Sequence, residues 1–335
     1  MKLDARDIAY YKKHLEEAKT LHANEFTSKI DLSLYKAYYS ADDANEDQLA
    51  QDMTADGTVW ISNNKLFPAT NRVLPTFYWQ NPRIVAKMRR SNSDVSAQVL
   101  TAKLNYEYRE RGLKKINQKV ILDAWYSGFG GVKIGYTAQF RQKPTESKGI
   151  LSKIKGMVSK SEDKADTQSP DTSLNEQEFI EYEGLWVKRL DPKNVFFDPR
   201  TPVDEDKIIW IKYPRTLQEV MDSPMYPDID PKFISRFKGT QDEREINLEL
   251  YEGWVRKPDG LYICVYADRW NDPLRWDKSS WLGDGFPMSF LSFADVPETK
   301  YPPSFMKVAM KPQQQISYLS TMQGRVVDKF RSQTG

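Results

Sequence analysis

The chain has little of the chemistry that enzymes and metalloproteins use. Its 335 residues include one cysteine and two histidines. Cys264 has no second cysteine to pair with, and its place in the alternating run LYICVY predicts a buried strand residue rather than a nucleophile. His14 and His22 are eight residues apart on one expected helix. Metal-binding histidine pairs on a helix usually lie four residues apart, so we expect no zinc site.

A marked excess of either charge and a long apolar run are also missing. Lys and Arg total 49 against 47 Asp and Glu, which gives a net charge of +2. A protein that grips nucleic acid tightly usually has a clear positive excess, whereas near neutrality suits one that lets DNA slide past or never meets it. No run approaches the roughly 20 apolar residues that span a bilayer, and the start MKLDARD lacks the regions of a signal peptide. We expect a cytoplasmic protein with no membrane partner.

The motifs of common enzyme classes do not occur. The sequence has no GxxxxGK[ST], GxSxG or HExxH. The glycine-rich run GFGGVKIG follows an expected helix and precedes an expected strand, the reverse of a dinucleotide loop, so it predicts a tight helix-to-strand turn. Asp191 and Asp198 each precede proline, which favours Asx turns over a catalytic pair. We expect no catalytic residue, cofactor or metal. A carbohydrate-active enzyme stays an alternative, because aromatic and carboxylate side chains are plentiful.

The patterns that are present predict an α+β fold, with helices packed on a mainly antiparallel sheet and a long helix protruding at the carboxyl end. A capping box, Thr216 with Glu219, opens a short helix. A proline-punctuated span between Pro68 and Pro75 predicts another, with an extended run after Asn81-Pro82. The longer expected elements are helices at Asp4–Phe26 and Ser93–Ser127, the latter interrupted at Gly112 as two helices or one kinked helix, strands at Val132–Phe140 and Glu178–Arg189, and a hairpin at Ile246–Asp268.

Two segments differ from this core. Residues 143–177 have lost nearly all aromatic side chains and predict a mobile polar insertion between two strands. From Tyr301 onward, the prolines at 302, 303 and 312 predict a short helix followed by a longer one. The longer helix has a single apolar stripe, made of Ile316, Leu319, Met322, Val326 and Phe330.

Several segments, in order, resemble the portal proteins of tailed double-stranded DNA bacteriophages. They are NKLFPATNRVLPTFYWQNP, WYSGFGGVKIGY, LDPKNVFFDP with IIWIKYPRTLQEVM, and an FP-containing strand before KPQQQISYLSTM. The resemblance runs from Asn63 to Met322, interrupted by the polar insertion. It implies that residues 1–300 form the wing domain of a portal and that residues 301–335 begin its stem helix. We expect the clip, second stem helix and crown of the family to be absent from this chain.

The resemblance implies a structural protein without a catalytic site. Portal subunits form a ring, usually of twelve copies, at one capsid vertex of the virion, and the ring is assembled in the host bacterial cytoplasm. Its expected partners are further copies of itself, the major capsid protein, the terminase large subunit, the head-tail adaptor and double-stranded DNA that passes without sequence recognition. Another head-tail or tail structural protein is the alternative, and the number of subunits would separate the two.

Two sets of residues are the candidate contacts of such a ring. Aromatic residues are enriched at protein interfaces, and the candidates for subunit contacts are Phe67, Phe77, Trp79, Trp270 and Trp276. The candidates for weak contacts to the DNA backbone are Arg109, Lys114, Lys115, Arg325 and Lys329. For the first three of these, the other interpretation is a solvated helix face on which acidic residues alternate with basic ones.

Overall fold

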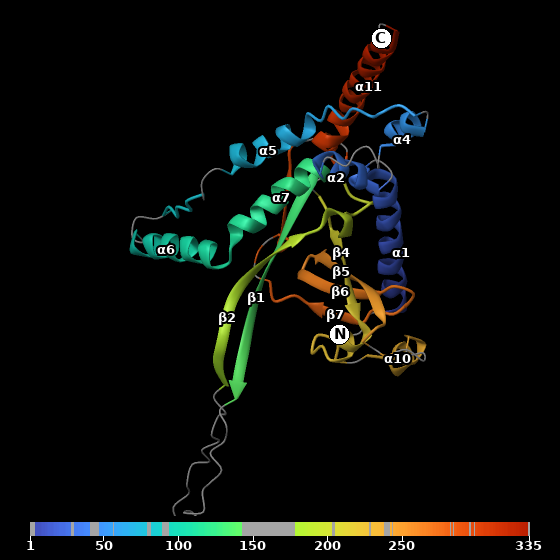
Figure 1. Ribbon diagram of the computed structural model, residues 1–335. Helices are drawn as coiled ribbons and strands as arrows, with labels where there is room; N and C mark the ends of the chain where they lie inside the picture. Colours follow the sequence, from blue (N-terminus) through green and yellow to red (C-terminus); the bar gives the residue numbers. More distant parts are fainter. Residues whose placement is uncertain are drawn as a thin grey trace, which may run out of the picture. The chain divides into compact units, whose positions relative to one another are not determined.

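The computed structural model describes residues 4–27, 30–40, 47–55, 57–78, 82–88, 94–142, 178–202, 205–227, 229–237, 242, 244–281, 283, 285–294, 296–297 and 299–333. These residues form a mixed fold of helices and antiparallel sheets (Figure 1), which confirms the predicted class at this level. The chain divides into two compact units, Met1–Lys133 with Val187–Gly335, and Ile134–Trp186. Trp79 and the polar insertion at 143–177 lie outside the described residues.

The amino-terminal helix begins where the sequence predicted. Asp4 caps α1 (Ala5–His22) by accepting a hydrogen bond from the Ala5 N–H, and one turn of π-helix (Ala23–Thr27) follows. Two short helices, α2 (Leu32–Ser40) and α4 (Gln48–Ala55), come next and were not predicted. Both are shorter than an isolated helix needs for stability in water, so packing against the rest of the chain has to maintain them.

The proline-punctuated span forms α5 (Leu66–Phe77). Asn64 begins it, because its side-chain oxygen accepts a hydrogen bond from the Phe67 N–H at 3.0 Å. After the extended segment 82–88, the predicted long helical region is two helices, α6 (Asp94–Glu110) and α7 (Leu113–Ser127). Gly112 separates them in a left-handed conformation with φ of 59°, so the predicted break is confirmed.

Gly128 makes the predicted turn from helix to strand. Its φ is 92°, and a Cβ atom there would lie 2.0 Å from the carbonyl oxygen of Pro302, so only glycine fits. The strand that follows, β1 (Phe129–Gln142), is the middle strand of a sheet ordered β2-β1-β8, with β2 at Glu178–Leu190 and β8 at Met288–Ser292. β1 and β8 run antiparallel, with Phe129 opposite Ser292.

The second sheet is a five-stranded antiparallel meander ordered β3-β4-β5-β6-β7. Its strands are β3 (Val195–Phe196), β4 (Ile208–Thr216), β5 (Asn247–Lys257), β6 (Gly260–Ala267) and β7 (Arg275–Lys278). The predicted hairpin is the β5–β6 pair, and the capping box opens α9 (Leu217–Met221), so both predictions are confirmed. A 3-10 turn (Pro192–Asn194) precedes β3, and α10 (Pro231–Phe237) follows α9. Trp276, a candidate subunit contact, lies on β7.

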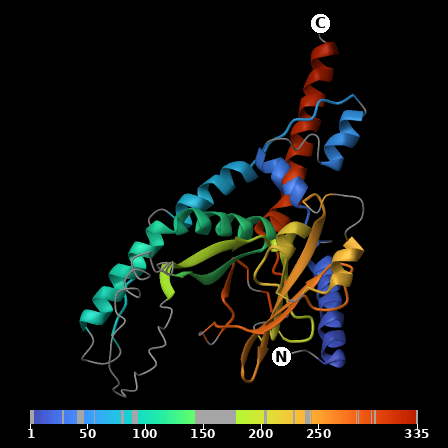
Figure 2. The ribbon, with the colours of Figure 1, turned by 90° about the horizontal axis from the view of Figure 1, so that it is seen from below.

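The two faces of this five-stranded sheet pack in two different clusters. Alternate residues of β4 face opposite ways: Ile208 and Trp210 pack in the core under α1, whereas Ile209 and Ile211 pack in the cluster that also contains Phe129 of β1 and Phe290 of β8. Figure 2 shows α1 running beside the sheet. The core under α1 contains Tyr11, Leu15, Ala18, Phe196, Ile208, Trp210, Tyr251, Val255, Cys264 and Tyr266. The place of Cys264 there confirms that it is a strand core residue, and burial raises the pKa of its thiol.

The last element, α11 (Phe305–Gln333), is one continuous helix. We predicted a short helix ending before Pro312 and a longer one after it, and this boundary is wrong. Proline inside a helix leaves the carbonyl four residues earlier, here that of Val308, without its N–H donor. Val308 and Pro312 are both exposed to solvent, so water can satisfy the carbonyl and the helix continues through the proline.

Candidate functional site

The inward face of α11 is polar where it meets the segment 58–65. Gln313, Ser317 and Thr321 are buried and lie four residues apart, so they form one row along the helix, the polar ladder of α11. Three backbone N–H groups donate to it: Lys65 to Gln313 at 2.8 Å, Asn63 to Ser317 at 3.3 Å, and Ile61 to Thr321 at 2.9 Å. Four helical residues advance about 6 Å and two extended residues about 6.6 Å, so the two spacings match.

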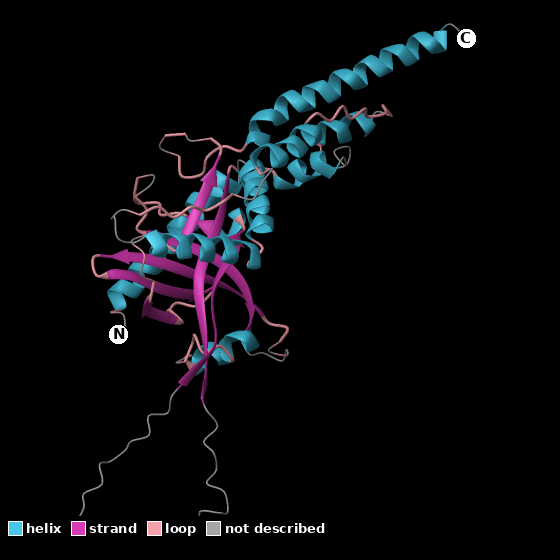
Figure 3. Cartoon of the chain, turned by 90° about the vertical axis from the view of Figure 1, so that its left-hand side faces the viewer, coloured by secondary structure: helices cyan, strands magenta, loops and turns pink. Residues whose placement is uncertain are grey.

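The outward face of α11 is apolar. Of the stripe predicted from the sequence, Ile316, Leu319, Val326 and Phe330 are exposed, whereas Met322 is half-buried. Leu319 is 58% exposed, Val327 63% and Phe330 66%. We call Ile316, Leu319, Val326, Val327 and Phe330 the apolar stripe of α11. Figure 3 shows the last turns of the helix running beyond the neighbouring helices. An amphipathic helix normally buries its apolar side, so this arrangement is the reverse of the usual one.

The predicted aromatic residues have different environments. Phe67 and Phe77 are both exposed on α5, with ring centroids 5.4 Å from Tyr39 and 5.0 Å from Phe293 respectively. Large exposed rings on one helix leave apolar surface for another molecule to cover.

The two tryptophans of the carboxyl-terminal half are only partly exposed, because other rings of the same chain pack on them. Trp270 meets Phe233 edge to face at 5.4 Å. Trp276 stacks on Tyr262 at 5.2 Å, and Lys257 Nζ lies 4.8 Å from its ring centre. Trp270 and Trp276 therefore expose a smaller fraction of their surface for a subunit contact than Phe67 and Phe77 do.

The five predicted basic residues fall into two groups. Arg109, Lys114 and Lys115 are exposed near the junction of α6 and α7, whereas Arg325 and Lys329 are exposed on the last turns of α11. The first group belongs to a basic stretch: residues 83–119 contain ten Lys and Arg against three Asp and Glu. One of those acids, Glu107, pairs with Arg111 at 3.0 Å. This stretch has a charge of +7, more than an evenly mixed helix face would have.

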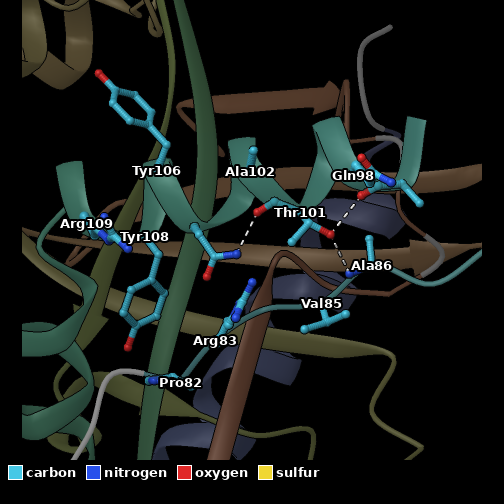
Figure 4. Close-up of a pocket in the computed structure, with 12 residues that line it drawn as sticks. Pro82, Arg83, Val85, Ala86, Gln98, Thr101, Ala102, Tyr106, Tyr108 and Arg109 are labelled. Atoms are coloured by element: carbon cyan, nitrogen blue, oxygen red, sulfur yellow. Dashed lines mark hydrogen bonds between the residues drawn. The ribbon is translucent and has the colours of Figure 1, made fainter. Parts of the chain in front are cut away.

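A groove that was not predicted from the sequence lies along α6. The extended segment 82–88 runs beside the helix, and the space lined by both measures about 800 Å³ (Figure 4). The side-chain oxygen of Asn105 accepts a hydrogen bond from the Ile84 N–H at 3.0 Å, and its amide donates to the Ile84 carbonyl at 2.8 Å. The Thr101 hydroxyl accepts a hydrogen bond from the Ala86 N–H at 3.0 Å. The available signal was a pair of polar residues four apart on a helix that follows an extended run.

A buried polar cluster under α1 is structural. Trp210 donates its indole N–H to His14 Nδ1 at 3.1 Å, so the ring proton of His14 is on Nε2 and is directed at Asp198 Oδ1, 2.9 Å away. Burial raises the pKa of Asp198, but hydrogen bonds from His14 and from the Arg200 N–H outweigh it and leave the pKa at about 2. The bond from Arg200, at 2.9 Å, confirms the predicted Asx turn at Asp198. The Asp191 carboxylate accepts a hydrogen bond from the Lys193 N–H, which confirms the Asx turn predicted there.

No known family model matches the chain, and no curated protein matches it. Within the described ranges, no group of three or more His, Cys, Asp or Glu side chains is placed to hold a metal ion. In the same part of the chain no helix is long and apolar enough to cross a bilayer. The surfaces that the geometry offers are the apolar stripe of α11, the exposed phenylalanines of α5 and the groove along α6.

Proposed function

We propose that the chain is a subunit of the portal ring of a tailed double-stranded DNA bacteriophage, a structural protein that forms the channel for DNA packaging and ejection. The proposal takes up the resemblance of its segments to portal proteins. It assigns residues 1–300 to the wing domain and α11 to the start of the stem. The helix-glycine-strand junction at Gly128 and the Pro-Gln helix of α11 are two of the segments that carry the resemblance.

The observation that carries the proposal is the reversed polarity of α11. Its polar ladder is satisfied inside the chain, while its apolar stripe faces outward. Fully burying a side chain such as Leu319 or Val327 contributes about 1.5–3 kcal/mol, which a single copy forgoes. A neighbouring subunit packed on the stripe recovers it.

Closure into a ring requires that each subunit have two different complementary faces. The apolar stripe of α11 is one candidate face. The other is the exposed aromatic surface of α5, with Phe67 and Phe77, to which Trp270 and Trp276 add smaller areas. Trp79 stays a candidate from the sequence. These two surfaces lie on different elements, as a heterologous contact requires.

DNA contacts in this proposal are weak and independent of base sequence. A net charge of +2 provides no global attraction, so local groups such as Arg109, Lys114, Lys115, Arg325 and Lys329 would meet phosphates without reading bases. The remaining partners follow from the family: the major capsid protein, the terminase large subunit and the head-tail adaptor, at one vertex of the virion.

Electron microscopy of the purified protein, with particle mass measured on the same sample, tests the proposal. We expect rings of about twelve subunits around a hole at least roughly 20 Å wide, enough for B-form DNA. A compact monomer at every concentration, or a closed dimer, would overturn it. Titration with two duplexes of unrelated sequence should give equal affinities that fall together as salt rises.

A further inference from the structure

The segment 82–88 has one open edge. Successive residues of an extended chain direct their N–H and C=O groups to opposite sides. Ile84 and Ala86 face α6, where Asn105 and Thr101 bind them. Arg83, Val85 and Lys87 therefore direct their backbone groups away from the helix. No backbone hydrogen bond reaches these three residues from the rest of the described chain. An open edge of this kind is a template for another strand.

A second open edge belongs to β2. In the sheet ordered β2-β1-β8, β2 has a neighbour on one side only among the strands that the structure describes. It is 13 residues long, against 5 for β8 at the other edge, and 2 and 4 for the edge strands β3 and β7 of the larger sheet. Its first nine residues, EFIEYEGLW, contain three glutamates and no basic residue. Among the described edge strands, β2 is therefore the longest, and its first nine residues are acidic.

The two edges have opposite charge. Residues 83–119 carry +7, and the whole chain carries +2, so the remainder of the chain carries −5. Arg83 and Lys87 are exposed, and the sequence of β2 contains Glu178, Glu181 and Glu183. Opposite charges on facing strands favour pairing, and like charges oppose it.

A strand fits the open edge of 82–88 better than a nucleic acid does. DNA would satisfy Arg83, Lys87 and Arg109 through its phosphates, but it does not offer alternating donors and acceptors at strand spacing. The groove also contains apolar surface on the segment itself, because Val85 is 60% exposed. Figure 4 shows Tyr106 pointing away from the segment and Arg83 pointing toward α6. A strand provides both backbone partners and apolar side chains.

We infer that β2 of a second copy adds to the open edge of 82–88. The occupant is a second copy because the chain itself supplies both halves of the pair. The inference rests on the proposed function, since an acidic edge that joins a basic edge on the next subunit is a heterologous contact that can repeat around a ring. It adds to that function a specific strand-to-strand contact between neighbours.

Two charge variants test the pairing. Variant A carries Arg83→Glu and Lys87→Glu, and variant B carries Glu181→Lys and Glu183→Lys. Alone, each puts like charges on the two facing edges, and its self-association should weaken about tenfold or more. In a 1:1 mixture every A edge finds an oppositely charged B edge, so assembly should return to within about threefold of the natural chain. Sedimentation velocity of A, B and the mixture measures this.

A backbone variant separates strand addition from simple charge attraction. Val85→Pro removes only the outward N–H, because the extended conformation accepts proline at that position. We expect it to weaken association about fivefold or more, while the control Val85→Thr changes association less than about twofold. Circular dichroism of each variant as a monomer checks that the fold is intact.

The outcomes distinguish the inference from the proposed function. Rings that form in A, B and Val85→Pro alike overturn the inference and leave the portal proposal standing. Rescue in the mixture, but into filaments or dimers, supports the strand contact and overturns the portal proposal. A mixture no better than A or B alone overturns the inference. If the charge variants change binding of duplex DNA and not association, the basic edge is a polyanion site and the inference fails.

Discussion

Replacing Gln313 by leucine should destabilise the chain, although it puts an apolar side chain into a buried position. Gln313 is 2% exposed. Its side-chain oxygen accepts from the Lys65 N–H, and its amide donates to the Asn63 carbonyl at 3.0 Å and to Ser317 Oγ at 3.1 Å. Leucine has nearly the same volume and can make none of these bonds.

The size of the effect follows from the three hydrogen bonds that are lost, of which two leave a backbone group without its partner, while Ser317 Oγ keeps the bond from the Asn63 N–H. Each costs about 1 kcal/mol, at the low end of the usual range, because the two backbone groups are only partly buried. Burying leucine in place of an amide returns about 1–2 kcal/mol. The free energy of unfolding should therefore fall by about 1–2 kcal/mol, which for a domain of this size lowers the melting temperature by about 2–8 °C.

Urea unfolding followed by tryptophan fluorescence, at one dilute protein concentration, measures the change. The matched control is Gln315→Leu, the same substitution two residues later on the exposed side of α11, which should change stability by less than about 0.5 kcal/mol. If Gln313→Leu is as stable as the natural chain or more so, the polar ladder does not stabilise the packing of the segment 58–65 on α11. The claim that these hydrogen bonds decide which side of α11 faces inward would then be wrong.

Three other perturbations have defined outcomes. Val327→Gln should leave monomer stability within about 0.5 kcal/mol but weaken self-association in sedimentation runs, because Val327 is exposed in one copy and covered only in an assembly; unchanged association would contradict a role for the stripe. The carboxyl of Asp198 has its pKa lowered to about 2 in the fold, so its contribution is present above the ordinary pKa near 3.8 and is lost as pH falls toward 2. In Asp198→Asn, stability should be lower at pH 7 and flatter against pH over that window; an unchanged slope would contradict the assignment. Gly128→Ala should cost more than about 3 kcal/mol or abolish folding, because its Cβ would overlap a carbonyl oxygen at a positive φ, whereas Gly285→Ala, with open space around it, should be nearly neutral in thermal melts.

The sequence was most informative where a signal is local. The Asp4 cap, the break at Gly112, the turn at Gly128 and the box at Thr216 each depend on the conformational needs of one residue or a few neighbours. Such needs are the same in any tertiary context, so the boundaries they set were predicted correctly. The prolines at 75 and 312 are exceptions, since both lie inside helices: whether a proline ends a helix depends on how exposed the freed carbonyl is.

The candidate surfaces depended on distant parts of the chain. The stripe of α11 was visible as an apolar spacing, yet a spacing gives the period of a helix and not the direction in which its apolar side faces. That direction is decided by the segment 58–65, more than 240 residues earlier, whose backbone needs partners that Gln313, Ser317 and Thr321 supply. The groove along α6 arises in the same way, from Asn105 binding the backbone of Ile84.

The sequence by itself determined where several of the helices and strands lie, that both histidines lie on the first helix, and that the single cysteine lies inside a strand. Only the tertiary structure decided which faces are covered. Backbone hydrogen-bonding groups must find partners when they leave water, and the helix side that provides them is turned inward even when it is the polar one. The apolar side of α11 is consequently left exposed, where another copy of the chain can cover it.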